Sequence, residues 1–221
     1  MKNILLGNRV PYEYFITSGA GESDAGSKGL PFETGSYDEA LTHAGIENAN
    51  VIEYTSVIPT GAKALSREDG IKRLQWGEVL ECIKAQANGN KGEFISAAVM
   101  TTSIYSPKGI YLGGFACEYS GSGTKAEAEK SLEMSIAGII ERRKLGIMPK
   151  SGTLYKDSKT STGYTIHPGK LFVYDSLQIK KHHGTVLTAI CFVSYNFPLL
   201  KSASTSGSTS SKSSRKTRKT K

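Results

Sequence analysis

Residues 48–59 read Asn48-Ala49-Asn50-Val51-Ile52-Glu53-Tyr54-Thr55-Ser56-Val57-Ile58-Pro59 and are rich in β-branched and aromatic side chains. Such side chains favour β-strands. Proline cannot donate to a sheet ladder and is typical of a strand end. We therefore expect one strand from Asn50 to Ile58, stopped by Pro59.

Similar apolar runs on both sides of this segment predict a protein built mostly from strands. The expected strands cover residues 11–18, 77–88, 94–105, 110–119 and 184–197. Residues 19–29 and 146–170 are rich in Gly, Ser, Pro and Thr, so we expect loops there.

Two capping-box patterns predict two helices. Ser36-x-x-Glu39 precedes an expected helix over 37–44, and this start would place Asp38 in the first turn, where the helix dipole favours a carboxylate. Thr124-x-x-Glu127 precedes a helix running to about residue 144. Its apolar stripe consists of Leu132, Ile136, Ile139 and Ile140. Several strands grouped around two helices indicate an α+β fold with layered sheets.

The positive charge is concentrated at the C-terminus. The net charge is +8, but seven basic residues and no acidic one lie at or after Lys201, which leaves +1 for residues 1–200. We expect a folded domain over 1–200 and a disordered Ser/Thr/Lys/Arg-rich tail over 201–221, since the tail has no large apolar side chain to bury. A nearly neutral domain argues against a nucleic-acid-binding protein. The basic tail alone would be a weak anchor for nucleic acid or acidic membrane lipid, or it would be a solvated extension.

Cysteine usage and hydropathy favour a cytoplasmic protein. Cys82, Cys117 and Cys191 are widely spaced and lie in apolar runs, so free buried thiols in a reducing compartment are expected. The apolar run at the start is too short for a signal peptide, and none approaches the ~20 residues that span a bilayer. His182-His183 lies in a charged turn, which favours solvated side chains over a metal site.

Five short blocks surround the Thr55-Ser56 pair in a defined order. They are Gly19-Ala20-Gly21-Glu22-Ser23-Asp24, Pro31-Phe32-Glu33-Thr34, Tyr37-Asp38-Glu39-Ala40-Leu41, Ala44-Gly45-Ile46-Glu47-Asn48 and Gly113-Gly114-Phe115-Ala116-Cys117-Glu118-Tyr119. With these blocks, residues 10–197 resemble the pyruvoyl-dependent arginine decarboxylase proenzymes. The likeness is closest to the bacterial branch, in which Thr precedes the scissile Ser.

The resemblance implies an α+β fold arranged as a four-layer αββα sandwich, assembled as a homotrimer with active sites at the subunit interfaces. It also implies self-cleavage between Thr55 and Ser56 into a β chain, 1–55, and an α chain, 56–221. Ser56 would become a covalent pyruvoyl group, so neither pyridoxal phosphate nor a metal would be needed. The implied reaction converts L-arginine to agmatine and CO₂. The alternative is a processing-deficient homologue that acts as a structural or regulatory subunit, although Thr55, Ser56, Glu118 and Asn50 are all present.

Asn50 and Glu118 match family positions with chemical roles. The Asn50 amide would assist self-processing as a hydrogen-bond donor, or it would only satisfy a turn at a strand start. Six extended residues span roughly 20 Å, so Asn50 reaches its own Thr55 carbonyl only if the chain bends or a neighbouring subunit supplies the amide. Glu118 would protonate the substrate Cα as an acid whose pKa is raised by burial. Its strand face carries the small residues Gly114 and Ala116, which leaves room for a ligand. The simpler alternative is a carboxylate paired with Lys or Arg.

Asp38 matches the family position that holds the substrate guanidinium. A carboxylate accepts two parallel N–H bonds from a guanidinium, which separates arginine from lysine by geometry. Asp38 could also be no more than a helix-start charge. Glu22 and Asp24, in the glycine-rich stretch, are secondary candidates for the same contact.

Overall fold

The protein is described by a computed structural model that covers residues 6–24, 32–149 and 157–200, and the predicted tail at 201–221 lies outside these ranges. Its elements are β1 (Val10–Ser23), α1 (Phe32–Ala44), β2 (Asn50–Glu53), β3 (Val57–Ile58), β4 (Lys63–Ala64), α2 (Arg67–Ile71), β5 (Val79–Asn90), β6 (Phe94–Tyr105), β7 (Tyr111–Gly121), α3 (Lys125–Arg142), β8 (Ser158–Lys159), β9 (Thr165–Gln178) and β10 (His183–Asn196). The predicted α+β class is confirmed.

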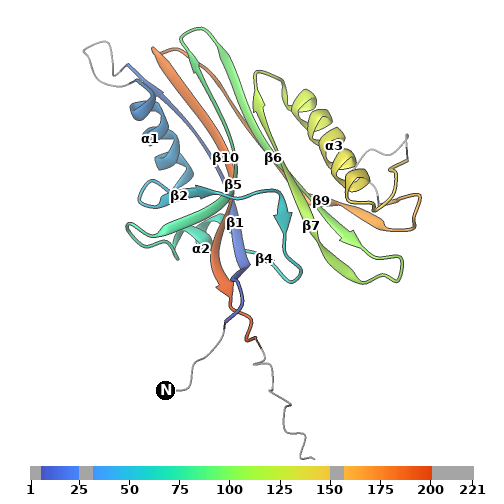
Figure 1. Ribbon diagram of the computed structural model, residues 1–221. Helices are drawn as coiled ribbons and strands as arrows, with labels where there is room; N and C mark the ends of the chain where they lie inside the picture. The colour runs from blue at the N-terminus through green and yellow to red at the C-terminus, as the bar shows by residue number, and fades with distance from the viewer. Residues whose placement is uncertain (1–5, 25–31, 150–156, 201–221) are drawn as a thin grey trace, which may run out of the picture.

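The strands form two five-stranded sheets. The first has the order β2-β5-β10-β1-β4 and the second the order β3-β7-β6-β9-β8. Their facing sides meet across one apolar cluster, which includes Ile83, Ala85, Val99, Ile190 and Phe192. Figure 1 shows the two sheets side by side, with α1 next to one and α3 next to the other.

Helix α1 packs closely against β1 because two glycines allow the contact. A Cβ at Gly19 would lie 2.1 Å from the Ala40 carbonyl oxygen, and one at Gly21 would lie 2.4 Å from that of Ser36. The Gly-x-Gly pattern thus serves close helix–strand packing. The apolar cluster beneath α1 includes Ala40, Ala44, Leu80 and Leu187.

Helix α3 begins where its capping box predicts. The Thr124 side chain accepts from the Glu127 N–H, and the Glu127 carboxylate accepts from the Thr124 N–H at 2.8 Å. Three of the four expected stripe residues, Leu132, Ile136 and Ile140, are fully buried together with Ala128, whereas Ile139 is partly buried.

Between β2 and β3 the chain passes from one sheet to the other, so the single strand expected over 50–58 is wrong. β2 pairs with β5 through Asn50 to Glu53, whereas β3 pairs with β7 through Val57 and Ile58. Residues 54–56 make the crossing. Residue propensity describes local conformation only, and it carries no information about which sheet a strand joins.

Three further expectations are corrected by contacts between distant segments. β1 extends through Ser23 into the expected loop, because it pairs with β10 along its whole length. β9 begins inside the loop expected over 146–170 and pairs with β6. Helix α1 begins at Phe32, so Ser36 is not its cap. The Ser36 hydroxyl lies 2.8 Å from that of Thr185 instead, and Asp38 is not in the first turn.

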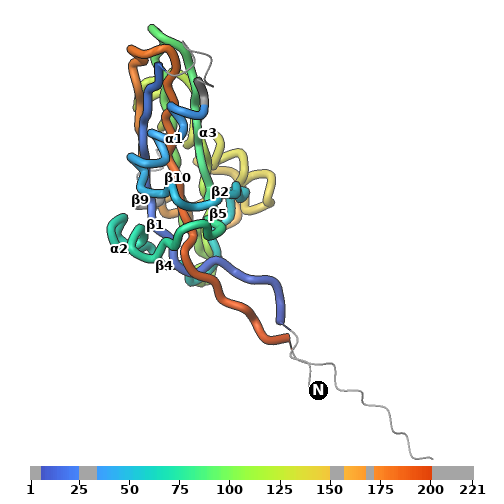
Figure 2. Tube along the Cα trace, turned by 90° about the vertical axis from the view of Figure 1, so that its left-hand side faces the viewer, coloured from blue at the N-terminus to red at the C-terminus, as the bar shows by residue number. Residues whose placement is uncertain are grey.

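The two ends of the described chain lie together. Leu6 bridges to Leu199, and the Gly7 N–H donates to the Pro198 carbonyl at 2.7 Å. Figure 2 shows both ends leaving the body on the same side. In the described ranges no helix has the length and apolar character to cross a membrane. All three cysteines are free and buried, as predicted.

Candidate active site

Ser56 is held by the second sheet. The Ala116 N–H of β7 donates to its carbonyl oxygen at 2.9 Å, immediately before β3 begins. β3 in turn fits against β7 at Gly113, which has φ +103° and where a Cβ would lie 2.6 Å from the Ile58 carbonyl oxygen. Gly113 therefore allows the backbone after Ser56 to lie directly on β7.

The backbone forms a tight turn centred on Ser56. The Val57 N–H donates to the Thr55 carbonyl at 3.0 Å, a bond between residues i+2 and i. Ser56 does not have a positive φ, so the turn is the inverse γ-turn. The carbonyl carbon that Ser56 would have to attack therefore belongs to a carbonyl that already accepts a backbone hydrogen bond.

Ser56 and Glu118 line one pocket of about 500 Å³. β3 covers only two residues of β7, so the edge of β7 beyond Ala116 has no strand partner among the described residues. The pocket lies along this edge and is closed on its other side by α3. The structure thus brings together Ser56 and Glu118, two of the three residues to which the sequence assigned the chemistry, but not Asn50.

The pKa of Glu118 is raised above the ordinary carboxyl value. Burial by the surrounding protein atoms is the largest cause, and the negative charge of Glu53 raises it further, while a backbone hydrogen bond opposes both. The side chain still reaches solvent. No Lys, Arg or His in the described part of the chain forms an ion pair with Glu118. The direction of the shift suits a proton donor near neutral pH.

Residues of α3 form the part of the pocket that sequence reasoning missed. They are Ser131, Met134, Ser135, Ile139 and Arg142, joined by Cys117 of β7. Spacings of three and four residues place them on one face of the helix, and this periodicity was the available signal. Burial raises the pKa of Cys117 to about 12, so this thiol remains protonated and unreactive.

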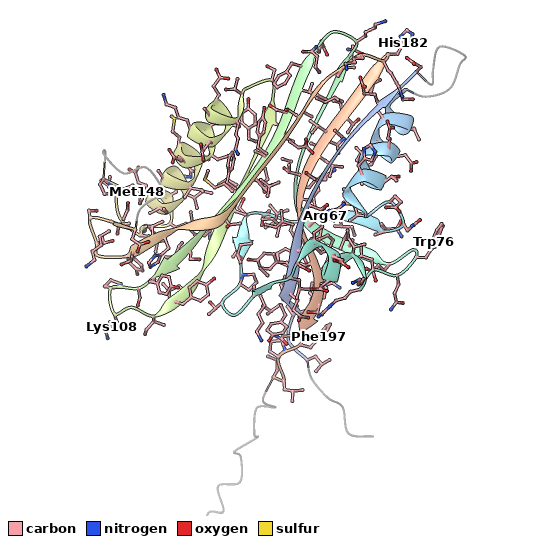
Figure 3. The ribbon with its side chains drawn as sticks, turned by 180° about the vertical axis from the view of Figure 1, so that it is seen from behind. Arg67, Trp76, Lys108, Met148, His182 and Phe197 are labelled. Carbon is pink, nitrogen blue, oxygen red and sulfur yellow. The ribbon has the colours of Figure 1, made fainter. Side chains whose placement is uncertain are left out.

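Asn50 lies away from this pocket. Its side-chain amide donates to the Gly77 carbonyl at 2.8 Å, and it starts β2 opposite Val79. The neighbouring Trp76 is 86% exposed and points away from the body of the protein (Figure 3). Within one chain the donor to the Thr55 carbonyl is the Val57 N–H, so a role for Asn50 in processing stays a prediction.

Asp38 is exposed on α1, which packs on the first sheet, while the Ser56 pocket faces α3 beside the second. The Asp38 backbone carbonyl accepts a hydrogen bond from the Thr42 hydroxyl, one turn later in the helix, at 2.9 Å. The two secondary candidates have structural roles. Glu22 accepts the N–H groups of Lys180 and Lys181, and Asp24 accepts that of His182, at the turn between β9 and β10.

A buried lysine connects the helix of Asp38 with the strand before the Thr55-Ser56 bond. The Lys84 side chain is only 7% exposed, and its ammonium lies 3.0 Å from a Glu53 carboxylate oxygen. The same ammonium lies 5.2 Å from the centre of the Tyr37 ring on α1. Glu53, which raises the pKa of Glu118, is thus fixed by an ion pair.

These features place groups able to transfer protons beside a backbone carbonyl. The pocket is lined by three serine hydroxyls, one carboxyl with a raised pKa and one arginine, and next to Ser56 is a carbonyl that accepts a hydrogen bond. In the described ranges no cluster of three or more His, Cys, Asp or Glu side chains is placed to hold a metal ion.

Comparison with known proteins agrees with the geometry. The family model described as pyruvoyl-dependent arginine decarboxylase (PvlArgDC) matches residues 13–197. Pyruvoyl-dependent arginine decarboxylase AaxB of Chlamydia muridarum is 31% identical over 202 residues, which cover 86% of this chain and 94% of that protein.

Other relatives match over a shorter stretch. The AaxB protein of Chlamydia abortus is 38% identical over 118 residues, covering 51% of this chain, and the match spans only 60% of that relative's length. Pyruvoyl-dependent arginine decarboxylase 2 of Archaeoglobus fulgidus is 31% identical over 113 residues, covering 51% of this chain and 66% of that protein. From the model match over 13–197 and the near full-length likeness to the Chlamydia muridarum protein, this chain belongs to the pyruvoyl-dependent arginine decarboxylase family.

Proposed function

We propose that the chain cleaves itself between Thr55 and Ser56 and then decarboxylates L-arginine to agmatine and CO₂. The observation that carries this proposal is the shared pocket of Ser56 and Glu118 in a member of this family. The β chain would be residues 1–55 and the α chain 56–221.

Self-cleavage uses the turn at Ser56. The Ser56 Oγ attacks the Thr55 carbonyl carbon, and collapse of the tetrahedral centre breaks the C–N bond and leaves an ester. β-Elimination then gives a Thr55 carboxylate and a dehydroalanine at 56, which takes up water and releases ammonia to leave the pyruvoyl group. The Val57 N–H, 3.0 Å from the Thr55 oxygen, supports this route as the donor to the developing oxyanion.

The residues around position 56 fit such a group, because Ser56 opens onto the pocket and Glu118 lines it. The pyruvoyl group would supply the electron sink for loss of CO₂. Glu118, whose pKa is raised by burial, would deliver the proton to the substrate Cα. Arg142 contributes positive charge to the pocket, where the substrate carboxylate is the complementary group.

We also propose that the layers form a four-layer αββα sandwich and that three copies assemble into a trimer. The support is the position of Asp38, on the helix that packs on the first sheet, whereas the pocket lies beside the second. A guanidinium contact from Asp38, and the processing role of Asn50, would then come from a neighbouring subunit.

Intact mass under denaturing conditions tests the proposal. We expect two fragments from the wild-type chain, with the larger one blocked to N-terminal sequencing, and agmatine formation from arginine. Ser56→Ala removes the nucleophile and should leave one full-length, folded and inactive chain. A wild-type chain that remains uncleaved under conditions that preserve its fold would contradict the proposal and favour the processing-deficient alternative.

A further inference from the structure

Glu81 is a buried carboxylate that the proposed chemistry leaves unused. It is 4% exposed and lies on the same face of β5 as Ile83, which belongs to the apolar cluster between the sheets. One carboxylate oxygen accepts a hydrogen bond from the Tyr54 hydroxyl at 2.6 Å, and the other pairs with Arg9. Tyr54 directly precedes Thr55, whose carbonyl belongs to the proposed scissile bond.

Tyr54 is fixed to the first sheet in three ways. Its N–H donates to the Cys82 carbonyl at 2.7 Å, its hydroxyl donates to Glu81, and its ring centre lies 5.8 Å from that of Phe192. Burial and the neighbouring Glu81 carboxylate raise the pKa of Tyr54, so its phenol stays protonated and able to donate.

Ser56, two residues later, is fixed to the second sheet through the Ala116 N–H. Thr55 is therefore the single residue between two anchors on different sheets. Because neighbouring Cα atoms are about 3.8 Å apart, a shift of Tyr54 is transmitted directly to the Thr55 carbonyl.

The fold alone does not require a charge at position 81. Burying a carboxylate is costly unless it is paired, and replacement of a buried ion pair by apolar residues is often neutral or stabilising. Glu81 contacts Arg9, Tyr195 and Tyr54, and of these three Tyr54 starts the crossing segment. The buried carboxylate therefore has a use if it holds Tyr54 in place.

We propose that Glu81 and Tyr54 are a positioning pair for self-cleavage. The pair holds Tyr54, the residue before Thr55, so that the Thr55 carbonyl stays in the γ-turn, within reach of the Ser56 hydroxyl. This inference rests on the proposed function and adds residues that touch neither substrate nor the reacting atoms.

The test measures the rate of cleavage of freshly purified precursor by intact mass. Tyr54→Phe removes only the hydroxyl that meets Glu81 and keeps the ring on Phe192. A misplacement of about 1 Å can cost on the order of 10² in rate, so we expect cleavage at least about tenfold slower than in wild type. Tyr14→Phe is the matched control, because its ring packs on the same Phe192, 6.0 Å away, and it is not bonded to Glu81. It should cleave at the wild-type rate.

A conservative series at position 81 separates positioning from general stability. Glu81→Gln keeps an oxygen that accepts from Tyr54 and should cleave faster than Glu81→Leu, which keeps none, even where the leucine variant has the higher Tm. Cleavage of Tyr54→Phe within twofold of Tyr14→Phe, at a temperature well below both Tm values, would overturn the inference. Failure of the wild-type chain to cleave would instead overturn the proposed function, so the two failures are distinct.

Discussion

At the scale of single residues, Glu118 has its pKa raised by two separate causes. Burial at the edge of β7 is the larger, and Glu53 adds the second. The Glu53 carboxylate forms an ion pair with the Lys84 ammonium at 3.0 Å. This ion pair restricts the position of the Glu53 side chain relative to Glu118. An acid with a raised pKa is the form that a Cα proton donor needs at neutral pH.

Replacing Glu118 should separate the two reactions. Glu118→Gln should self-cleave normally, because the amide is isosteric, but should lose on the order of 10²–10⁴ in kcat, the usual contribution of general acid catalysis. The measurement is agmatine production per cleaved chain. A loss of less than about threefold, with complete cleavage, would remove Glu118 from the acid role.

The pH dependence of kcat should move when Glu53 is neutralised. Glu118 acts in its protonated form, so kcat falls as the pH rises through its raised pKa. Glu53→Gln removes a nearby negative charge and lowers that pKa, so the fall should begin at lower pH than in wild type. Burial still raises the pKa, so a shift back to that of an ordinary exposed carboxyl is not expected.

Glu68→Gln is the matched control for this profile. Its carboxylate also pairs with a lysine, Lys72 at 2.6 Å, but on the exposed surface of α2. The basic limb of its kcat profile should coincide with that of wild type. Identical profiles for wild type and Glu53→Gln would show that the charge of Glu53 does not reach Glu118 in the working enzyme.

Sequence reasoning found those site residues whose chemistry is unusual for their position. Glu118 stands out as a carboxylate in an apolar strand. The two-residue period separates Ala116 from Cys117, which pack in different clusters, but the pocket beside Glu118 is lined by Cys117 and not by the small residues Gly114 and Ala116. Glu81 carries the same signal, but its meaning depends on Tyr54 and Arg9, which are 27 and 72 residues away in the sequence. Contacts at such separations leave no local pattern.

At the scale of elements, the outcome for the two capping boxes shows what local sequence determines. Thr124 and Glu127 have no stronger partner and form their box. The same pattern at Ser36 and Glu39 fails because distant groups compete for both side chains. Ser36 meets Thr185 of β10, and Glu39 accepts the Glu22 N–H of β1 at 2.6 Å. The crossing between β2 and β3 was missed for the same reason, since pairing with β5 or β7 is a tertiary choice.

Close packing of α1 on β1 yields a stability prediction. Gly21→Ala would place a Cβ 2.4 Å from the Ser36 carbonyl oxygen and 2.6 Å from the Ala40 nitrogen, both backbone atoms that can move only with the helix. Overpacking of this kind costs about 1–3 kcal/mol. For a chain of this size each kcal/mol lowers Tm by roughly 2–4 °C, which calorimetry can measure.

Gly138→Ala in α3 is the comparison for that substitution. A Cβ at Gly138 would meet the Arg142 side chain, 3.0 Å away, which is long and can move aside. Alanine should stabilise the helix by about 0.5–1 kcal/mol, because glycine loses more backbone freedom on folding. Equal Tm values for Gly21→Ala and wild type would show that α1 adjusts without cost.

At the scale of the whole molecule, the separation of Asp38 from the Ser56 pocket becomes a question of assembly. Helices α1 and α3 lie beside different sheets (Figure 1), and the described lining of the pocket includes residues of α3 but none of the helix that carries Asp38. The family resemblance predicted both a guanidinium contact at Asp38 and a trimer. We propose that the first depends on the second, because Asp38 does not line the pocket of its own chain.

Asp38→Asn should act on substrate binding more than on chemistry. The guanidinium is unchanged by the reaction, so a contact with it is made equally in the ground and transition states. Loss of such uniform binding raises KM for arginine strongly while kcat falls less. An unchanged KM, measured on fully cleaved protein, would place the guanidinium contact at another residue.

Mixed assemblies test whether that contact crosses between subunits. Ser56→Ala chains supply Asp38 but no pyruvoyl group. Asp38→Asn chains supply the pyruvoyl group but not the Asp38 carboxylate. If one site takes its pyruvoyl group from one chain and Asp38 from the next, random co-assembly in equal amounts yields roughly a quarter of all sites intact. Co-expressed, doubly tagged oligomers should therefore recover arginine turnover at low substrate concentration, with a KM close to that of wild type. If both residues served the same site from the same chain, no site in any mixture would be intact, and turnover at low arginine would stay at the level of the Asp38→Asn chains alone.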